Sequence, residues 1–76
     1  MSGLMRLLFE EGLARGPYAG EDTDTFEWLQ AETADVAAAV AAGEDPAAVL
    51  IDTGWWHPEW GPFDPDLRAR IIEAAS

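Results

Sequence analysis

The chain has 76 residues and a mass of 8.2 kDa, enough for a single small domain over residues 1–76. Fifteen acidic residues oppose four basic ones, for a formal net charge of −11 at pH 7. Because phosphate contacts need cations, this balance excludes direct binding to nucleic acid or to an anionic membrane surface. The absence of cysteine excludes disulfides, thiolate zinc sites and cysteine nucleophiles. Hydrophobic residues make up 49% of the chain, which predicts a folded core rather than disorder.

The first predicted element is an amphipathic helix over residues 2–15. Its apolar residues recur at the spacing of one helical face: Leu4 and Leu8, then Met5, Phe9 and Leu13. Gly16 and Pro17 end this helix, because glycine favours the residue after a helix and proline cannot continue one. A turn-rich link follows as far as the next helix.

The clearest predicted helix begins at Asp24 and ends before Gly43. Asp24, followed three residues later by Glu27, resembles an acidic capping box, and Gly43 is suited to the C-terminal end. Steps of three and four residues predict one buried stripe: Phe26, Leu29, Thr33, Val36 and Val40. The many alanines favour a helix and allow another helix to approach closely.

Two Asp-Pro pairs predict the starts of two further helices. Asp45 and Pro46 begin a short helix through about Ile51, although its apolar run is also compatible with a strand. Asp64 and Pro65 begin the last helix. The inward stripe of that helix contains Leu67, Ile71 and Ala74 or Ala75. The predicted fold is therefore all-α, a small bundle of three to four short helices.

An aromatic, proline-rich loop is predicted between these last two helices. It contains Trp55, Trp56, His57, Trp60 and Phe63. Each buried aromatic ring removes roughly 150–250 Å² from water, so a chain this small has good reason to fold the loop back over its helices. The same rings are also suited to an interface. The sequence leaves open whether Trp55, Trp56, Trp60 and Phe63 belong to the core or to a binding surface.

An acidic face is predicted on the second helix. On a helical wheel the carboxylates lie opposite the apolar stripe: Asp24, Glu27, Glu32 and Asp35. They follow one another at about 4 Å along the axis, close to the roughly 3.4 Å charge spacing of a nucleic-acid strand. Trp28 falls among them, and tryptophan is enriched among interface hot spots. These five residues are the predicted partner-binding site.

The leading functional hypothesis is an acidic inhibitor or modulator that occupies the basic, nucleic-acid-binding surface of a target protein. Small DNA mimics encoded by phages, including some anti-CRISPR proteins, share this size and charge, which is an analogy of class. The expected partner is a protein with a basic surface. We expect no enzymatic activity, cofactor or metal.

Three alternatives stay open. The chain could be a structural or assembly subunit that binds through its tryptophan loop, with the acids serving solubility. It could be a small domain adapted to high salt, since carboxylates without lysine keep proteins soluble there. It could also bind a divalent metal near His57 and Glu59, although one histidine is poor support for a zinc site.

The string VLIDTG at positions 49–54 resembles the catalytic loop of retroviral-type aspartic proteases. That resemblance implies Asp52 as the catalytic residue, sharing a proton with its twin across a dimer. It covers six residues of an all-β family, Trp55 replaces the usual small residue, and the flanking sequence is helical. Only a few apolar residues precede Glu10 and Glu11, too few for a secretory signal or a membrane helix, so we expect a cytoplasmic protein.

Overall fold

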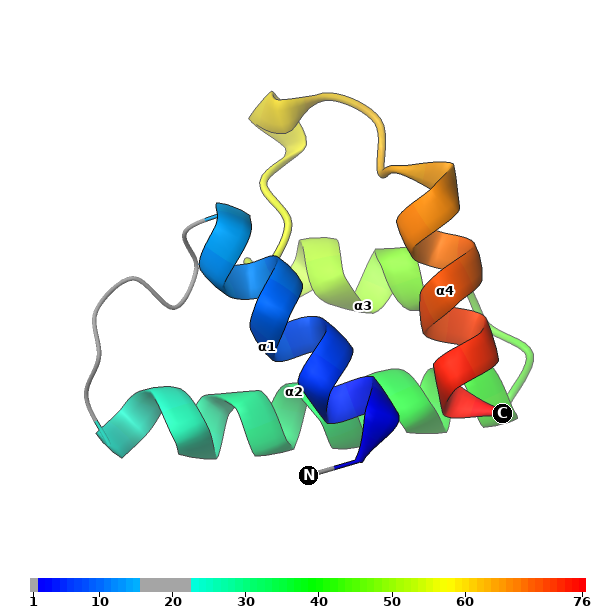
Figure 1. The fold of residues 1–76 in the computed structure, drawn as a ribbon. Helices are drawn as coiled ribbons and strands as arrows, with labels where there is room; N and C mark the ends of the chain where they lie inside the picture. The colour runs from blue at the N-terminus through cyan, green and yellow to red at the C-terminus, as the bar shows by residue number, and fades with distance from the viewer. Residues whose placement is uncertain (1, 16–22) are drawn as a thin grey trace.

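The computed structural model describes residues 2–15 and 23–76. Over these residues the chain forms four α-helices and one 3-10 turn, without strands. The helices are α1 (Gly3–Arg15), α2 (Thr23–Ala41), α3 (Pro46–Asp52) and α4 (Pro65–Ala75), and the turn is η1 (Pro58–Trp60). The all-α prediction is confirmed, with the aromatic loop before the last helix (Figure 1). The short apolar run after Pro46 is helical and not a strand.

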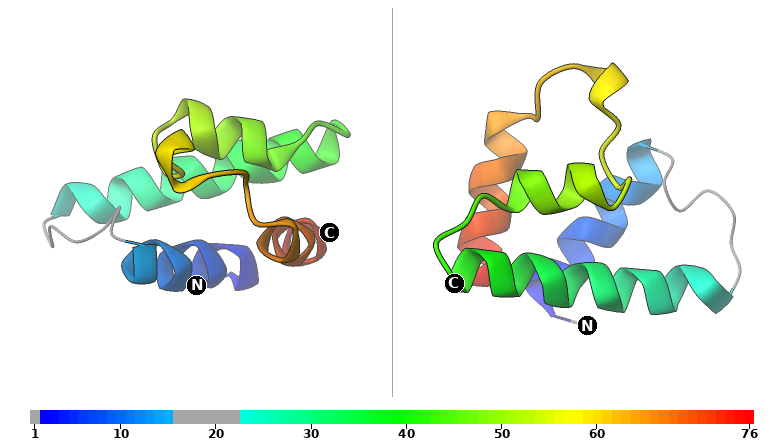
Figure 2. Two further views of the ribbon diagram at one scale, coloured as in Figure 1. Left: turned by 90° about the horizontal axis from the view of Figure 1, so that it is seen from above. Right: turned by 180° about the vertical axis from the view of Figure 1, so that it is seen from behind.

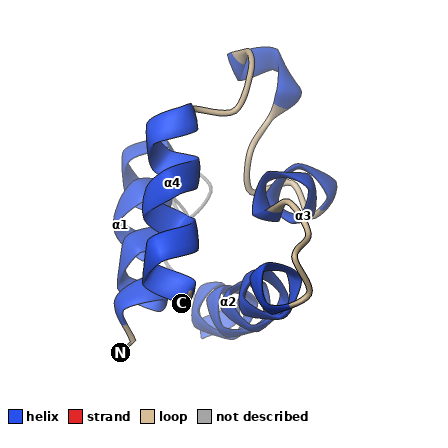
Figure 3. Ribbon diagram, turned by 90° about the vertical axis from the view of Figure 1, so that its right-hand side faces the viewer, coloured by secondary structure: helices blue, strands red, loops and turns tan. Residues whose placement is uncertain are grey.

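The helices form two layers (Figure 3). α1 and α4 lie side by side in one layer, and α2 and α3 form the other. α3 runs back along α2 in the opposite direction, and the aromatic loop then returns the chain to the first layer (Figure 2). α2 and α4 each contact the other three helices, so both layers contribute to the centre of the domain.

Short side chains cap two of the helices as the sequence predicts. Asp45 accepts a hydrogen bond from the Ala47 amide at 3.0 Å, and Asp64 accepts one from the Asp66 amide at 3.0 Å. Each aspartate thus satisfies a backbone donor that would otherwise lack a partner inside its helix. The proline that follows each aspartate occupies the first helical position, where its missing N–H is not needed.

Gly43 ends α2 in a left-handed conformation, with a φ of 78°. The Gly43 amide donates to the Val40 carbonyl at 3.1 Å, and the Glu44 amide donates to the Ala39 carbonyl at 2.8 Å. This pair of bonds is the Schellman arrangement, which satisfies the last carbonyls of a helix. It reverses the chain within a few residues, so that α3 packs directly against α2.

The hydrophobic core lies between the two layers. Its buried members come from all four helices and from the aromatic loop: Leu4, Leu8, Leu29, Val36, Leu50, Trp55, Trp56, Leu67 and Ile71. Met5, Phe9 and Trp28 pack against this cluster while remaining partly exposed. The predicted inward stripes of α1 and α4 are thus confirmed at their central residues, whereas Leu13 is exposed.

The predicted buried face of α2 is wrong at several positions. Phe26, expected in the core, is 51% exposed, and Glu32, expected in solvent, is only 1% exposed. The buried residues of this helix are Leu29, Glu32, Val36 and Ala39. The reason is that α3 packs along the Glu32 side of α2, which turns the buried face away from Phe26. In addition, α2 begins at Thr23, so Asp24 lies within its first turn instead of preceding it.

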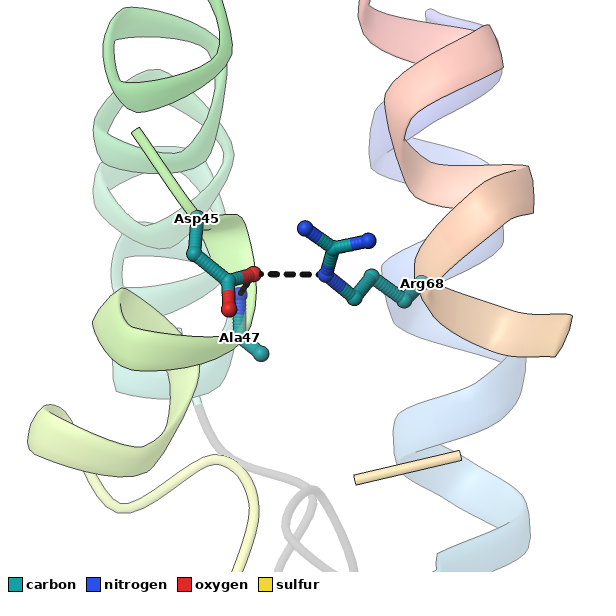
Figure 4. Close-up of polar contacts among 3 residues, drawn as sticks. All are labelled: Asp45, Ala47 and Arg68. Carbon is teal, nitrogen blue, oxygen red and sulfur yellow. Dashed lines mark hydrogen bonds and ion pairs between the residues drawn. The ribbon is translucent and has the colours of Figure 1, made fainter. Parts of the chain in front are cut away.

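Asp45 also connects the two layers. Its Oδ1 accepts a hydrogen bond from Arg68 Nε of α4 at 2.8 Å as well as the bond from Ala47 (Figure 4). The Arg68 bond, then the Ala47 bond, lowers the pKa of Asp45 below its usual value of 3.8. Ionised Asp45 therefore stabilises the folded state at every pH above 3.8. This stabilisation is lost as the pH falls through the lowered pKa of Asp45.

Asp45→Ala should destabilise the domain by about 1–2 kcal/mol, because it removes both a helix cap and a surface ion pair. Asp45→Asn keeps the capping oxygen and should lose at most about 1 kcal/mol. Urea unfolding at pH 7 would measure both values. Equal losses in the two variants would show that the charge, and not the cap, is the dominant contribution.

Candidate acidic interface

The arginines of the helices all lie in the layer of α1 and α4, whereas acidic residues occur in both layers. α1 and α4 each carry two arginines and two acidic residues, so their formal charges balance. The segment from α2 through α3 carries no basic residue. Its acidic residues are Asp24, Glu27, Glu32, Asp35, Glu44, Asp45 and Asp52. The fold therefore places the excess negative charge of the helices on the α2/α3 side.

Two ion pairs involve the arginines of α4. Arg70 of α4 pairs with Glu11 of α1 at 2.9 Å, within the balanced layer. Arg68 pairs with Asp45 at 2.8 Å, which neutralises one carboxylate of the acidic layer at its border with α4. Both pairs are at the surface, where they contribute little to stability. They do determine which carboxylates keep their full negative charge.

Two of the predicted site residues are exposed on α2, as the sequence suggested. Glu27 and Asp35 are both solvent-accessible. Asp24 belongs to the first turn of the helix, and its side chain lies outside the described part of the structure. Trp28 is half-buried and packs against the core cluster. It therefore supports the fold, and only part of its indole is accessible to a partner.

Glu32 does not belong to the exposed face, so its prediction as a contact for a partner is wrong. Its side chain lies in the core, with Oε1 2.5 Å from the hydroxyl of Thr53 at the end of α3. Burial raises the pKa of Glu32 above its usual value of 4.5, the nearby charge of Asp35 adds to this, and the Thr53 bond opposes it. A helical wheel of α2 alone misplaced this residue because the wheel contains no information about where α3 packs.

Two further exposed carboxylates lie in the acidic layer. Glu44 follows the end of α2, and Asp52 is the last residue of α3. The site predicted from the sequence was confined to one helix and so did not include Glu44 and Asp52. The signal that would have included them is the absence of any basic residue from α2 through α3. We define the acidic surface as the exposed carboxylates Glu27, Asp35, Glu44 and Asp52.

The aromatic loop belongs mainly to the core. Trp55 is fully buried, and Trp56 is buried with its indole N–H donated to the Gly61 carbonyl at 3.2 Å. Phe63 is half-buried, with its ring centroid 4.6 Å from that of Trp56. Trp60 is 38% exposed and meets Trp56 edge-on, with centroids 5.1 Å apart. Of the four residues for which core and interface were both open, Trp60 offers the most surface to a partner.

Within residues 2–15 and 23–76, the structure offers no support for metal binding, for a membrane-spanning helix or for an aspartic-protease site. No group of three or more histidine, cysteine or acidic side chains in this part of the chain is arranged to hold a metal ion. None of the helices described is both long enough and apolar enough to cross a bilayer. Asp52, the residue selected by the aspartic-protease resemblance, ends a short helix, whereas that family is all-β.

We compared the chain with known protein families, curated proteins and solved structures. The chain matches no protein-family model, no curated protein and no solved structure.

Proposed function

We propose that this protein is an acidic inhibitor or modulator that occupies the basic, nucleic-acid-binding surface of a target protein. The main support for this proposal is that the excess negative charge of the helices lies in the layer of α2 and α3, which contains no basic residue. The acidic surface has four exposed carboxylates without a basic neighbour in α2 or α3, whereas the arginines of α4 are held in ion pairs. Such one-sided charge steers association toward a basic partner and disfavours partners of like charge.

The proposal differs from the sequence hypothesis in its residues. Glu32 is withdrawn because it is buried, and Glu44 and Asp52 are added because they are exposed in the same layer. The acidic surface thus spans two helices and the turn between them instead of one helical row. We place its activity in the cytoplasm of the source cell or of an infected host cell.

The test is a capture experiment followed by measurement of affinity. The tagged protein is incubated with lysate from its source or host, washed with increasing salt, and challenged with duplex DNA. A basic nucleic-acid-binding protein that is displaced by DNA and by salt is the expected partner. That partner is then purified, and its affinity for the wild-type protein is measured at low and moderate salt.

Two variants of equal charge make the measurement specific. The first, Glu27→Gln/Asp35→Asn/Glu44→Gln/Asp52→Asn, neutralises the acidic surface. The second, Glu10→Gln/Glu59→Gln/Asp66→Asn/Glu73→Gln, removes four exposed carboxylates elsewhere. We expect the first variant to lose about tenfold or more in affinity at low salt, with a flatter salt dependence, and the second to lose much less. Equal losses would contradict a localised site.

The open alternatives predict different outcomes. An assembly subunit that binds through its loop would lose its partner in Trp60→Ala, would keep it in the first four-acid variant, and would resist DNA and salt. A domain adapted to high salt would capture no basic partner, and its melting temperature would rise strongly toward molar salt, as screening reduces repulsion between carboxylates. Calorimetry with divalent ions would reveal metal binding.

A further inference from the structure

Glu32 is a buried carboxylate at the contact between α2 and the end of α3. Its Oε1 lies 2.5 Å from Thr53 Oγ1, and the same hydroxyl lies 3.4 Å from the Leu50 carbonyl oxygen. No arginine among the described residues forms an ion pair with Glu32. A single hydroxyl is therefore the polar partner that the structure provides for this carboxylate, and an ionised carboxylate at this position lacks a compensating positive charge.

The Thr53 hydroxyl has one hydrogen and two oxygen neighbours, so the protonation of Glu32 decides which neighbour receives it. When Glu32 is ionised, its carboxylate accepts the hydrogen of Thr53. When Glu32 is neutral, its own O–H can donate to Thr53 Oγ1, and the hydrogen of Thr53 is then directed at the Leu50 carbonyl. Only the neutral form therefore permits an unbroken chain of donors and acceptors from α2 to the backbone of α3.

This pair of side chains lies where the aromatic loop leaves α3. Thr53 is the C-terminal cap of α3, and Trp55 and Trp56 follow it after a single glycine, Gly54. The Leu50 carbonyl, which the Thr53 hydroxyl approaches, also accepts the Trp56 amide at 3.0 Å. The hydrogen bonds at Leu50 and Thr53 thus connect the buried carboxylate to the backbone of Trp56, one of the two buried tryptophans of the core.

We propose that the buried Glu32 makes the packing of the start of the aromatic loop against α2 proton-linked. This packing is tight while Glu32 is neutral and loosens when Glu32 ionises, because the charged carboxylate has only the Thr53 hydroxyl and no positive charge to compensate its burial. The direction follows from burial: the folded state favours the protonated form. The neutral form of Glu32 contributes its full stabilisation of the folded state when the pH is below 4.5, the usual pKa of a glutamate. This stabilisation is lost as the pH rises through the raised pKa of Glu32.

The effect of Glu32 on stability must be distinguished from the effects of other charged groups that lie near it. Asp35, one turn along α2, is the charged group that acts on Glu32. The elements packed against α2 and the loop carry further titratable or charged groups, none of which bonds to Glu32: Arg6, Glu10, Glu11, Asp45, Asp52, His57, Glu59, Asp64, Asp66, Arg68, Arg70 and Glu73. Most are exposed, so 0.5 M NaCl screens their interactions while it leaves the burial of Glu32 unchanged.

The experiment compares melting temperatures in 0.5 M NaCl between pH 4.5 and 8 for the wild type, Glu32→Gln and the matched control Asp35→Asn. Glutamine keeps the shape and the hydrogen bond but cannot ionise. We expect Glu32→Gln to melt close to the wild type at pH 4.5 and about 4–8 °C above it at pH 8. Asp35→Asn should show a small difference that varies little with pH. A difference independent of pH in Glu32→Gln, or an equal effect in Asp35→Asn, would overturn the proposal.

A second readout tests the link to the loop. The indole N–H resonances of Trp55 and Trp56 should show a step with a midpoint above pH 4.5 in the wild type and in Asp35→Asn that is absent from Glu32→Gln, whereas steps caused by other groups of the loop should be common to all three proteins. If the same steps are seen in the wild type and in Glu32→Gln, Glu32 does not act on the loop. Should Glu32→Gln fail to fold, Thr53→Val serves instead. It removes the donor that lowers the pKa of Glu32, so the midpoint should move to higher pH, and an unchanged midpoint would refute the proposal.

Discussion

Replacing Trp55 with alanine is expected to destabilise the domain by about 3–5 kcal/mol, the usual loss for removing a buried aromatic side chain. A domain of this size has a total stability of about 4–11 kcal/mol, so this single change removes much of the margin. Trp55 is fully buried in the core, and its Nε1 has no hydrogen-bond partner among the described residues. Its contribution therefore comes from apolar contact. Circular dichroism with urea unfolding would measure the loss.

The matched control is Trp60→Ala, in the same loop. Trp60 is partly exposed, although its ring lies 4.8 Å from His57 and 5.1 Å from Trp56 between centroids. Since such aromatic pairs contribute about 0.5–1.5 kcal/mol, its loss should be clearly smaller than that of Trp55. Similar losses at the two positions would contradict the assignment of Trp55 to the core. The pair also separates folding from binding, because Trp60→Ala should remain folded and can be tested with a partner.

Replacing Leu50 with alanine is expected to destabilise the domain by about 2–5 kcal/mol. α3 has seven residues, which is too short for a helix to be stable without tertiary contacts. It is held in place by its cap at Asp45 and by the burial of Pro46, Ala47 and Leu50. Leu50 is the largest of these side chains. We therefore expect Leu50→Ala to loosen α3 from α2 and with it the attachment of the aromatic loop.

Ile51→Ala is the control for this change, since Ile51 is the next residue along α3 and is exposed. It should lose less than about 1 kcal/mol. Urea unfolding followed by tryptophan fluorescence would report both global stability and the environment of the loop. Comparable losses for Leu50→Ala and Ile51→Ala would mean that α3 does not pack through the face described.

Asp45 and Glu32 respond to pH in opposite directions. The pKa of Asp45 is lowered by Arg68 and by the helix cap, so Asp45 stabilises the fold at neutral pH. The pKa of Glu32 is raised by burial, so Glu32 destabilises the fold at neutral pH. Both carboxylates contact α3: Asp45 caps its start, and Glu32 meets Thr53 at its end. The two opposite effects of pH therefore act at the two ends of this helix.

Helix positions were predictable from the sequence because the determining interactions are local. The Asp-Pro pairs at residues 45–46 and 64–65 fix the starts of two helices through bonds that reach two residues along the chain. Gly43 ends α2 because the left-handed conformation that it adopts is strained for other residues. The composition likewise indicated a strongly acidic surface, since fifteen carboxylates cannot all be buried in a domain this small.

The faces that the helices bury depended on their packing. Phe26 and Glu32 exchanged their expected environments because α3 covers one side of α2, a contact between segments that are distant in sequence. The same contact brings α3 into one layer with α2, so that Glu44 and Asp52 belong to the layer that also carries Glu27 and Asp35. Periodicity shows that a helix has an apolar side. The direction of that side is set by the neighbours, whose buried area outweighs the unfavourable burial of one carboxyl group.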